Sequence, residues 1–189
     1  AFNKDSLIGV PGLFKCWLKK NVGIVNAIGT GVADDKVVYS YVNKMIVYYL
    51  GEQPILNQVE TYLCHDEIQK KYVIENISKL VVKPANASGG YGIMIGPKAP
   101  KEEREEVIKK IKKNPREYIA QPLETLSTAP TITKDDIEPR HLDLRPFILS
   151  GKSTYVTTGG LTRVALRKGS TIVNSSQGGG SKDTLVVDV

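Results

Sequence analysis

The sequence predicts an α+β protein built in lobes, because helical patterns dominate up to about Pro115 and strand patterns dominate after it. Apolar residues recur at steps of three and four from Val37 to Leu50, and a charged helical pattern covers Glu102 to Lys113. From Tyr118 onward the chain instead shows short runs rich in β-branched and aromatic residues. No internal repeat or low-complexity tract accompanies this change of pattern.

The helix and strand patterns before Tyr118 follow one another with clear stop signals. The long stripe ends at Gly51 and Pro54, and Asp34 or Asp35 can cap its start. The other expected helices are Leu13–Lys20, Asp66–Ile77 and Glu102–Lys113, and the expected strands are Val22–Ile28, Thr61–Cys64, Leu80–Pro84 and Ile93–Ile95. The last two strands and the glycine-rich turn between them predict a hairpin-like unit.

The part of the chain from Tyr118 is expected to contain mainly strands. The expected strands are Tyr118–Leu123, Leu142–Leu149, Thr154–Thr157, Leu161–Leu166, Thr171–Val173 and Leu185–Val189. In the helix before them, Glu105 and Glu106 precede Lys109 and Lys110 by the supportive four-residue spacing, so these lysines are read as one solvated face.

Composition limits the classes of protein that the chain can form. With 189 residues, 41% hydrophobic and 24% charged, it has room for one core or two small lobes, and it is not expected to be disordered or fibrous. The longest apolar run, Met45–Leu50, is far short of a membrane span, and no leader opens the chain. We therefore expect a soluble, cytoplasmic protein with no membrane partner. The start at Ala1 looks like the interior of a longer protein.

The net charge of +6 predicts an anionic partner, either nucleic acid or a phosphate-bearing small molecule. The tyrosines form no RNP-like pattern, which disfavours nucleic acid. Cys16 and Cys64 form no metal or disulfide framework, and His65 and His141 have no ligand-spaced partners. The chain contains no G-x-S-x-G elbow, so a serine hydrolase has no support.

The first candidate site is Lys83 at the end of a strand, followed by the segment Asn86–Gly92. One cation beside several free backbone N–H groups suits a polyphosphate, although an ordinary hairpin with a tight turn explains the same residues. Two familiar nucleotide motifs fail. No G-x-x-x-x-G-K-[ST] occurs, and Gly29-Thr30-Gly31 has Asp34 where a dinucleotide fingerprint needs its third glycine.

The second candidate site combines Asp143, Arg145, Arg163 and Asn174, with Gly178-Gly179-Gly180 close behind. Asp143 and Arg145 alternate along one expected strand and so share a face, and Arg163 comes from a neighbouring strand. Oxygen ligands such as these suit Mg²⁺, and arginines neutralise a transferring phosphoryl group. A surface ion pair beside a glycine-rich turn is the alternative explanation.

The order of these motifs resembles that of the ATP-grasp superfamily, and their amino-acid sequences resemble those of its circularly permuted type 2 family. That family is related to glutathionylspermidine synthase-like and peptide-forming carboxylate-amine ligases. The matching stretches cover nearly the whole chain: Gly29–Lys36, Val82–Pro84, Ser88–Gly92, Tyr118–Pro122, Pro139–Phe147, Gly159–Leu166 and Val173–Thr184. The resemblance implies two α+β lobes clasping ATP in a fragment of a longer circularly permuted protein.

The resemblance also implies roles for single residues. It implies that Lys36 and Lys83 contact the nucleotide or its phosphates. It also implies that a mobile lid over the phosphates is formed by Ser88, Gly89, Gly90, Tyr91 and Gly92. Backbone groups of the hinge at Gln121, Pro122 and Leu123 would meet adenine, and Glu124 would meet the ribose. Asp143 and Asn174 would bind Mg²⁺, with Arg145 and Arg163 as the catalytic arginines.

One position departs from the resemblance. The ribosomal-protein glutamate ligases, which are ATP-grasp relatives, carry a Glu two residues before the Asn, and Ile172 stands there in this chain. We expect the missing carboxylate to come from an acidic segment upstream of the sequence. Residues 1–35 would then be the remnant of a preceding domain, residues 36–115 the first lobe and residues 116–189 the second.

The activity that the resemblance implies is an ATP- and Mg²⁺-dependent carboxylate-amine ligase acting through an acylphosphate. Its partners would be ATP and small-molecule or peptide carboxylates and amines. Three alternatives stay open: an ATP-grasp kinase, an inactive nucleotide-binding or interaction module, and a basic nucleic-acid binder.

Overall fold

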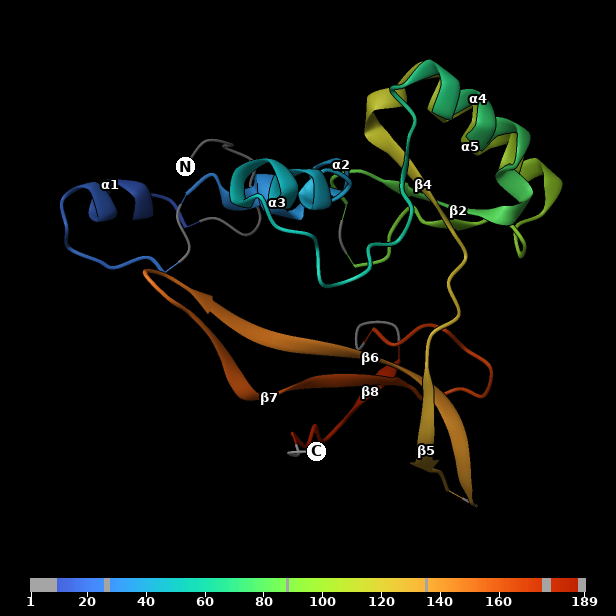
Figure 1. Ribbon diagram of the computed structural model, residues 1–189. Coiled ribbons are helices and arrows are strands. Elements are labelled where there is room, and N and C mark those ends of the chain that lie inside the picture. The colour runs from blue at the N-terminus through green and yellow to red at the C-terminus, as the bar shows by residue number, and fades with distance from the viewer. Residues whose placement is uncertain (1–9, 26–27, 88, 135, 175–177, 187–189) are drawn as a thin grey trace. The chain divides into compact units, whose positions relative to one another are not determined.

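The computed structural model describes residues 10–25, 28–87, 89–134, 136–174 and 178–186, which divide into one unit up to Leu56 and a second from Asn57 (Figure 1). Each unit is described by itself. In the described part of the chain, every helix is too short or too polar to cross a bilayer.

The first unit is helical. Its elements are α1 (Leu13–Leu18), η1 (Thr30–Asp34), α2 (Lys36–Tyr39) and α3 (Val42–Leu50). Asp35 caps α2 by accepting from the Val37 N–H at 2.7 Å, and α3 ends at Gly51 with φ 68° as predicted. The stripe expected to form one helix is divided at Ser40, whose hydroxyl donates to the Val37 carbonyl at 2.7 Å.

The strand expected at Val22–Ile28 does not form in its described residues, 22–25 and 28, and residues 26–27 lie outside the described residues. Apolar character alone therefore predicted a strand wrongly here. No residue assigned to a helix of this unit is buried.

The second unit begins with an antiparallel sheet in the order β1-β4-β2-β3. Its strands are β1 (Tyr62–Leu63), β2 (Leu80–Pro84), β3 (Met94–Ile95) and β4 (Tyr118–Pro122). The hairpin-like unit of β2 and β3 is confirmed, with Val81 opposite Ile95. Two helices lie on this sheet, α4 (Glu67–Glu75) and α5 (Lys101–Lys113), and the short helices η2 (Ile77–Lys79) and η3 (Pro115–Glu117) lead into β2 and β4 (Figure 1).

The hydrophobic core lies between this sheet and the two helices. Leu80 and Val82 alternate along β2 and pack there with Ala120 of β4. Val73 of α4 and Ile111 of α5 are fully buried against them. The helices thus cover one face of the sheet. Val81 and Lys83, which alternate with Leu80 and Val82 along β2, point to the other face.

A second antiparallel sheet has the order β5-β6-β7-β8. Its strands are β5 (Thr128–Ile132), β6 (Ile137–Ser150), β7 (Thr154–Ala165) and β8 (Gly179–Lys182). Two strands expected on either side of Gly159-Gly160 are one continuous strand. A Cβ at Gly160 would lie 2.9 Å from the Arg145 carbonyl oxygen, so this glycine permits close strand approach and does not end the strand.

Three other details of the second sheet differ from expectation. β5 contains Pro130 and was not predicted; its position at the edge of the sheet explains how the proline is tolerated. β8 forms from a glycine-rich segment that was read as a turn. No strand forms at Thr171–Val173 or at residues 185–186, and residues 187–189 lie outside the described residues.

Candidate functional site

The two arginines and the aspartate of the second sheet meet as their strand positions require. Asp143 of β6 lies directly opposite Arg163 of β7, and Arg145 follows two residues later on the same face. Arg163 Nη2 lies 3.2 Å and Arg145 Nη2 lies 2.9 Å from Asp143 Oδ2. The Arg163 side chain is 14% exposed and that of Arg145 is 52% exposed, so one guanidinium is largely enclosed and the other faces solvent.

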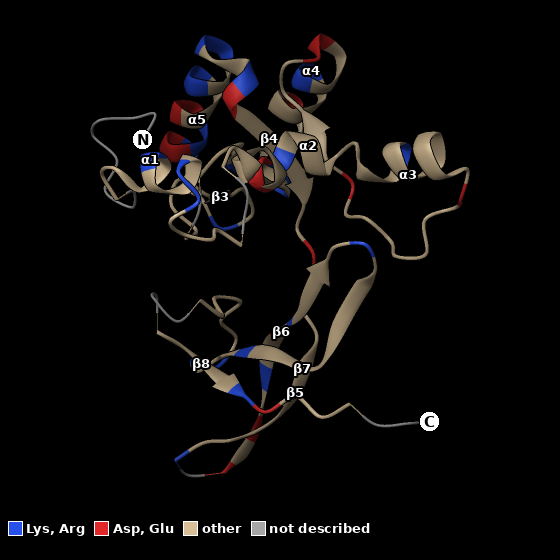
Figure 2. Ribbon diagram, turned by 90° about the vertical axis from the view of Figure 1, so that its left-hand side faces the viewer, with Lys and Arg blue, Asp and Glu red and all other residues tan. Residues whose placement is uncertain are grey.

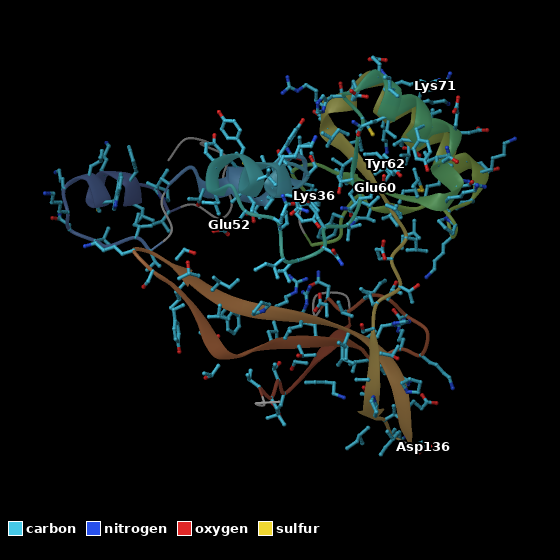
Figure 3. The ribbon with its side chains drawn as sticks, viewed as in Figure 1. Lys36, Glu52, Glu60, Tyr62, Lys71 and Asp136 are labelled. Carbon is cyan, nitrogen blue, oxygen red and sulfur yellow. The ribbon has the colours of Figure 1, made fainter. Side chains whose placement is uncertain are left out.

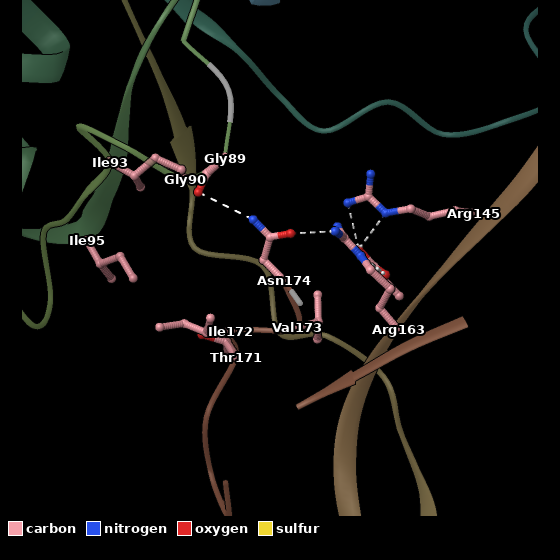
Figure 4. Close-up of a pocket in the computed structure, with 11 residues that line it drawn as sticks. Gly89, Gly90, Ile93, Ile95, Arg145, Arg163, Thr171, Ile172, Val173 and Asn174 are labelled. Atoms are coloured by element: carbon pink, nitrogen blue, oxygen red, sulfur yellow. Dashed lines mark hydrogen bonds and ion pairs between the residues drawn. The ribbon is translucent and has the colours of Figure 1, made fainter. Parts of the chain in front are cut away.

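Asn174 connects this cluster to the glycine-rich loop of the first sheet (Figure 4). Its Oδ1 accepts from Arg163 Nη1 at 2.7 Å, and its Nδ2 donates to the Gly89 carbonyl at 3.3 Å. One amide therefore bridges the arginine–aspartate cluster and a loop 85 residues away in the sequence.

These residues line a pocket of about 530 Å³, a size that falls in the range of small-ligand sites. Its polar wall contains Asp143, Arg145, Arg163 and Asn174, and its remaining wall is formed by Gly89, Gly90, Ile93, Ile95, Thr171, Ile172 and Val173. Figure 4 shows the arginines on one side and the glycines on the other, with Asn174 between them. The structure thus brings Gly89 and Gly90 of the first candidate site to the second, whereas Lys83 is not among the described residues that line this pocket.

The glycine-rich loop depends on backbone conformations that other residues rarely adopt. Gly89, Gly90 and Gly92 have φ of 70°, 82° and 72°. A Cβ on Gly92 would also lie 2.9 Å from Pro84 Cγ. Ser88 lies outside the described residues, and the Tyr91 side chain is exposed.

Lys83 takes part in a chain of side-chain hydrogen bonds across the first sheet. Its Nζ donates to Gln121 Oε1 at 2.6 Å, and Gln121 Nε2 donates to Thr61 Oγ1 at 2.9 Å. Thr61 was not predicted as a site residue, because its place next to Gln121 depends on how distant segments pair. Pro122 ends β4, and exposed Leu123 and Glu124 follow it.

Lys36 is the first residue of α2 (Figure 3) and belongs to the first unit, whereas the residues that line the pocket belong to the second. The predicted residues that the structure brings together around the pocket are Gly89, Gly90, Asp143, Arg145, Arg163 and Asn174. The carbonyl of Gly89, as a partner of Asn174, was not foreseen.

Helix α5 carries charges of both signs. Its glutamates lie in its first half and most of its lysines in its second (Figure 2), and Lys110 Nζ lies 2.7 Å from Glu106, as the four-residue spacing predicted. This contact lowers the pKa of Glu106. Glu105 lies 3.8 Å from Lys101, a different lysine from the one expected.

The donor chemistry of the pocket fits a hard cation such as Mg²⁺. Asp143 Oδ1 and Asn174 Oδ1 each accept one hydrogen bond from Arg163 and keep a further lone pair, whereas Asp143 Oδ2 is occupied by both arginines. Within the described ranges, no group of three or more His, Cys, Asp or Glu side chains is placed to bind a metal. Among the described residues that line the pocket, Asp143 is the one carboxylate, and the apolar Ile172 is part of the same lining.

An α+β unit in which a glycine-rich hairpin loop faces an arginine, carboxylate and amide cluster has the chemistry to bind a polyphosphate. A sequence model described as circularly permuted ATP-grasp type 2 matches residues 1–165. The chain belongs to the circularly permuted ATP-grasp type 2 family.

Similar proteins occur in several bacteria. The chain is 57% identical to an uncharacterized protein of Synechocystis sp. over 99% of its length and 39% of that protein, and 51% identical to one of Mycobacterium tuberculosis over 98% and 34%. It is 50% identical, over 95% of its length, to 21% of a Frankia casuarinae protein named "Putative glutamate--cysteine ligase 2-2". The chain therefore spans about two fifths or less of these relatives.

Proposed function

We propose that the second unit binds ATP in the pocket between the glycine-rich loop and the arginine cluster, as part of a Mg²⁺-dependent carboxylate-amine ligase. The observation that carries the proposal is the position of Arg163, which bonds Asp143 and Asn174 while Asn174 bonds the loop. Family membership and the ligase name of the Frankia relative support the same class of activity.

The roles proposed for single residues follow the chemistry of their side chains. Lys83 and the N–H groups of the loop from Ser88 to Gly92 hold phosphate oxygens, and Arg145 and Arg163 neutralise charge on the γ-phosphoryl group. Backbone groups at Gln121, Pro122 and Leu123 meet adenine, Glu124 meets the ribose, and Lys36 of the first unit is a further nucleotide contact. We retain residues 1–35, 36–115 and 116–189 as the proposed remnant and two lobes, in a cytoplasmic protein.

The proposed reaction has two steps. A substrate carboxylate oxygen attacks the γ-phosphorus of ATP, which releases ADP and leaves an acylphosphate. An amine nitrogen then attacks the acyl carbon, releases inorganic phosphate and loses a proton, and an amide results. The chain's own side chains orient the phosphates and balance their charge, so no protein nucleophile is needed.

Asp143 and Asn174 would hold Mg²⁺, which would supply positive charge to neutralise the phosphates when bound. Arg145 and Arg163 both donate to the Asp143 carboxylate and orient it.

A nucleotide-binding module without turnover is the second candidate, and one observation favours it. Ile172 lines the pocket where the glutamate ligases place a metal-binding carboxylate, and it is 46% exposed. The proposed ligase requires that this carboxylate come from elsewhere in a longer protein.

Hydroxylamine trapping tests the proposal, since hydroxylamine converts an acylphosphate into a stable hydroxamate. The full-length protein would be incubated with ATP, Mg²⁺, hydroxylamine and pools of amino acids and short peptides. We expect carboxylate-dependent ADP and hydroxamate, lost in Arg163→Ala. ADP with a hydroxylamine-stable phosphorylated product would indicate a kinase, and ATP binding without ADP would indicate the inactive module.

A further inference from the structure

The buried side chain of Gln121 is unusual among the polar groups near the proposed site. It is 8% exposed at the central strand pairing of the first sheet, opposite the buried Val81. Its amide accepts from Lys83 Nζ at 2.6 Å and donates to Thr61 Oγ1 at 2.9 Å. The Thr61 hydroxyl in turn donates to the Val59 carbonyl at 3.0 Å.

The direction of this chain of hydrogen bonds is fixed by its ends. An ammonium group can only donate, so the Gln121 oxygen must face Lys83. A carbonyl can only accept, so the Thr61 hydroxyl donates to Val59 and presents its lone pairs to the Gln121 NH₂ group. The Gln121 amide therefore has one orientation that satisfies both neighbours.

The chain of hydrogen bonds lies on the functional face of the sheet. Gln121 is directly opposite Val81, which is itself opposite Ile95, and Lys83 follows Val81 by two residues. These residues share one face, because opposite and alternate residues of an antiparallel sheet do. Ile95 lines the pocket, whereas the residues that alternate with these along the strands, Val82, Met94 and Ala120, pack under the helices.

We propose that Gln121 is a positioning residue whose neutral amide holds the Lys83 ammonium in place for a nucleotide phosphate without neutralising its charge. This inference rests on the proposed ATP binding. A glutamate of nearly the same shape would also hold Lys83, but as an ion pair it would cancel part of the charge that attracts phosphate. The choice of Gln over Glu thus keeps a carboxylate away from this contact with Lys83, and Thr61 keeps the amide oriented.

A purely structural role for Gln121 makes a different prediction. If the amide only satisfied buried polar groups, Gln121→Glu would still raise the titration midpoint of Lys83, as any adjacent carboxylate does, but nucleotide affinity would not change with it. The positioning role requires that the charge state of Lys83 respond to residue 121. It also requires that nucleotide affinity follow this response.

The experiment compares Gln121→Glu, Gln121→Met and Thr61→Val with the parent in the full chain. The first readout needs no nucleotide: the ¹³Cε resonance of Lys83 is titrated in protein labelled with ¹³C-lysine, with Lys83→Arg used for assignment. We expect a higher Lys83 midpoint in Gln121→Glu, which adds a carboxylate partner, and a lower one in Gln121→Met, which removes the acceptor.

The second readout is ATP affinity by calorimetry. We expect Gln121→Glu to weaken ATP binding about tenfold, which corresponds to about 1.4 kcal/mol, and Thr61→Val to weaken it less. ATP binding as tight in Gln121→Glu as in the parent would overturn the proposal, as would a Lys83 midpoint equal in all variants. If the parent binds no ATP, the proposed function fails instead, and the resonance still tests whether residue 121 controls Lys83. Thr61→Val keeps both readouts available if a Gln121 variant does not fold.

Discussion

Replacement of Arg163 by alanine is expected to destabilise the second unit far more than the same replacement of Arg145. Both guanidiniums contact Asp143 Oδ2, at 3.2 and 2.9 Å, so the pair is a matched comparison within one cluster. Arg163 additionally donates to Asn174 Oδ1 at 2.7 Å, and its side chain is 14% exposed against 52% for Arg145.

The structure determines the size of the expected difference. Arg163→Ala leaves the Asn174 oxygen without its arginine partner and Asp143 with only the solvent-facing Arg145. Loss of charge-assisted hydrogen bonds in a largely enclosed site costs about 2–3 kcal/mol. Arg145→Ala removes an exposed ion pair, so we expect a cost of about 0.5 kcal/mol after allowing for solvent screening.

Urea unfolding followed by circular dichroism measures both values, provided the slope with denaturant is unchanged. Equal destabilisation by the two variants would refute the argument, as would a cost below about 0.5 kcal/mol for Arg163→Ala. Either result would mean that the cluster does not organise this part of the unit.

Two further predictions concern burial and backbone conformation. Burial raises the pKa of the Cys64 thiol to about 11, so the folded state retains a proton that the unfolded state loses earlier, and stability should fall from roughly pH 9 to 11 by up to about 1.4 kcal/mol per pH unit. Unfolding titrations of Cys64→Ala should show a shallower slope between roughly pH 9 and 10, and a slope equal to the parent's there would contradict the assignment. Gly92→Ala should cost more than Gly169→Ala, since both have positive φ but only Gly92 would place a Cβ 2.9 Å from Pro84 Cγ. We expect about 1–2 kcal/mol for the backbone alone, and equal melting-temperature losses would argue against the steric contribution.

Local patterns predicted the first sheet and its helices well. β2 forms at Leu80–Pro84, the predicted residues, because a short run of apolar, partly β-branched residues that ends at a proline favours a strand over a helix. α4 forms at Glu67–Glu75, inside the expected Asp66–Ile77, and Asp66 caps it by accepting from the Gln69 N–H at 2.9 Å. Such signals are local, so they can be read without knowledge of the tertiary structure.

The second sheet was harder to predict because the effect of a glycine or a proline on a strand depends on where that strand lies in the sheet. Pro130 is acceptable in β5 only because that strand is at an edge, and Gly160 belongs inside β7 because the Arg145 carbonyl approaches it closely. The sequence does not say which strand is at the edge. It therefore predicted breaks where pairing with β6 makes continuous strands.

For the candidate site, alternation along β6 correctly predicted that Asp143 and Arg145 share a face with Arg163 nearby. The hydrogen bond from Asn174 to Gly89 and the link from Gln121 to Thr61 could not be predicted, because each depends on segments far apart in the sequence. The functional roles of all these residues remain predictions.

The most direct test of the proposed site is a thermal-shift titration of the chain with ATP and Mg²⁺, carried out beside Lys83→Ala and Lys79→Ala. A ligand that binds only the folded state raises its stability by about 2.7 kcal/mol at one hundred times its dissociation constant. Lys79 is an exposed lysine just before β2, so it controls for the loss of one positive charge. The proposed site predicts an ATP-dependent rise in melting temperature that Lys79→Ala keeps and Lys83→Ala loses. No rise at millimolar ATP, or an equal rise in both variants, would contradict it.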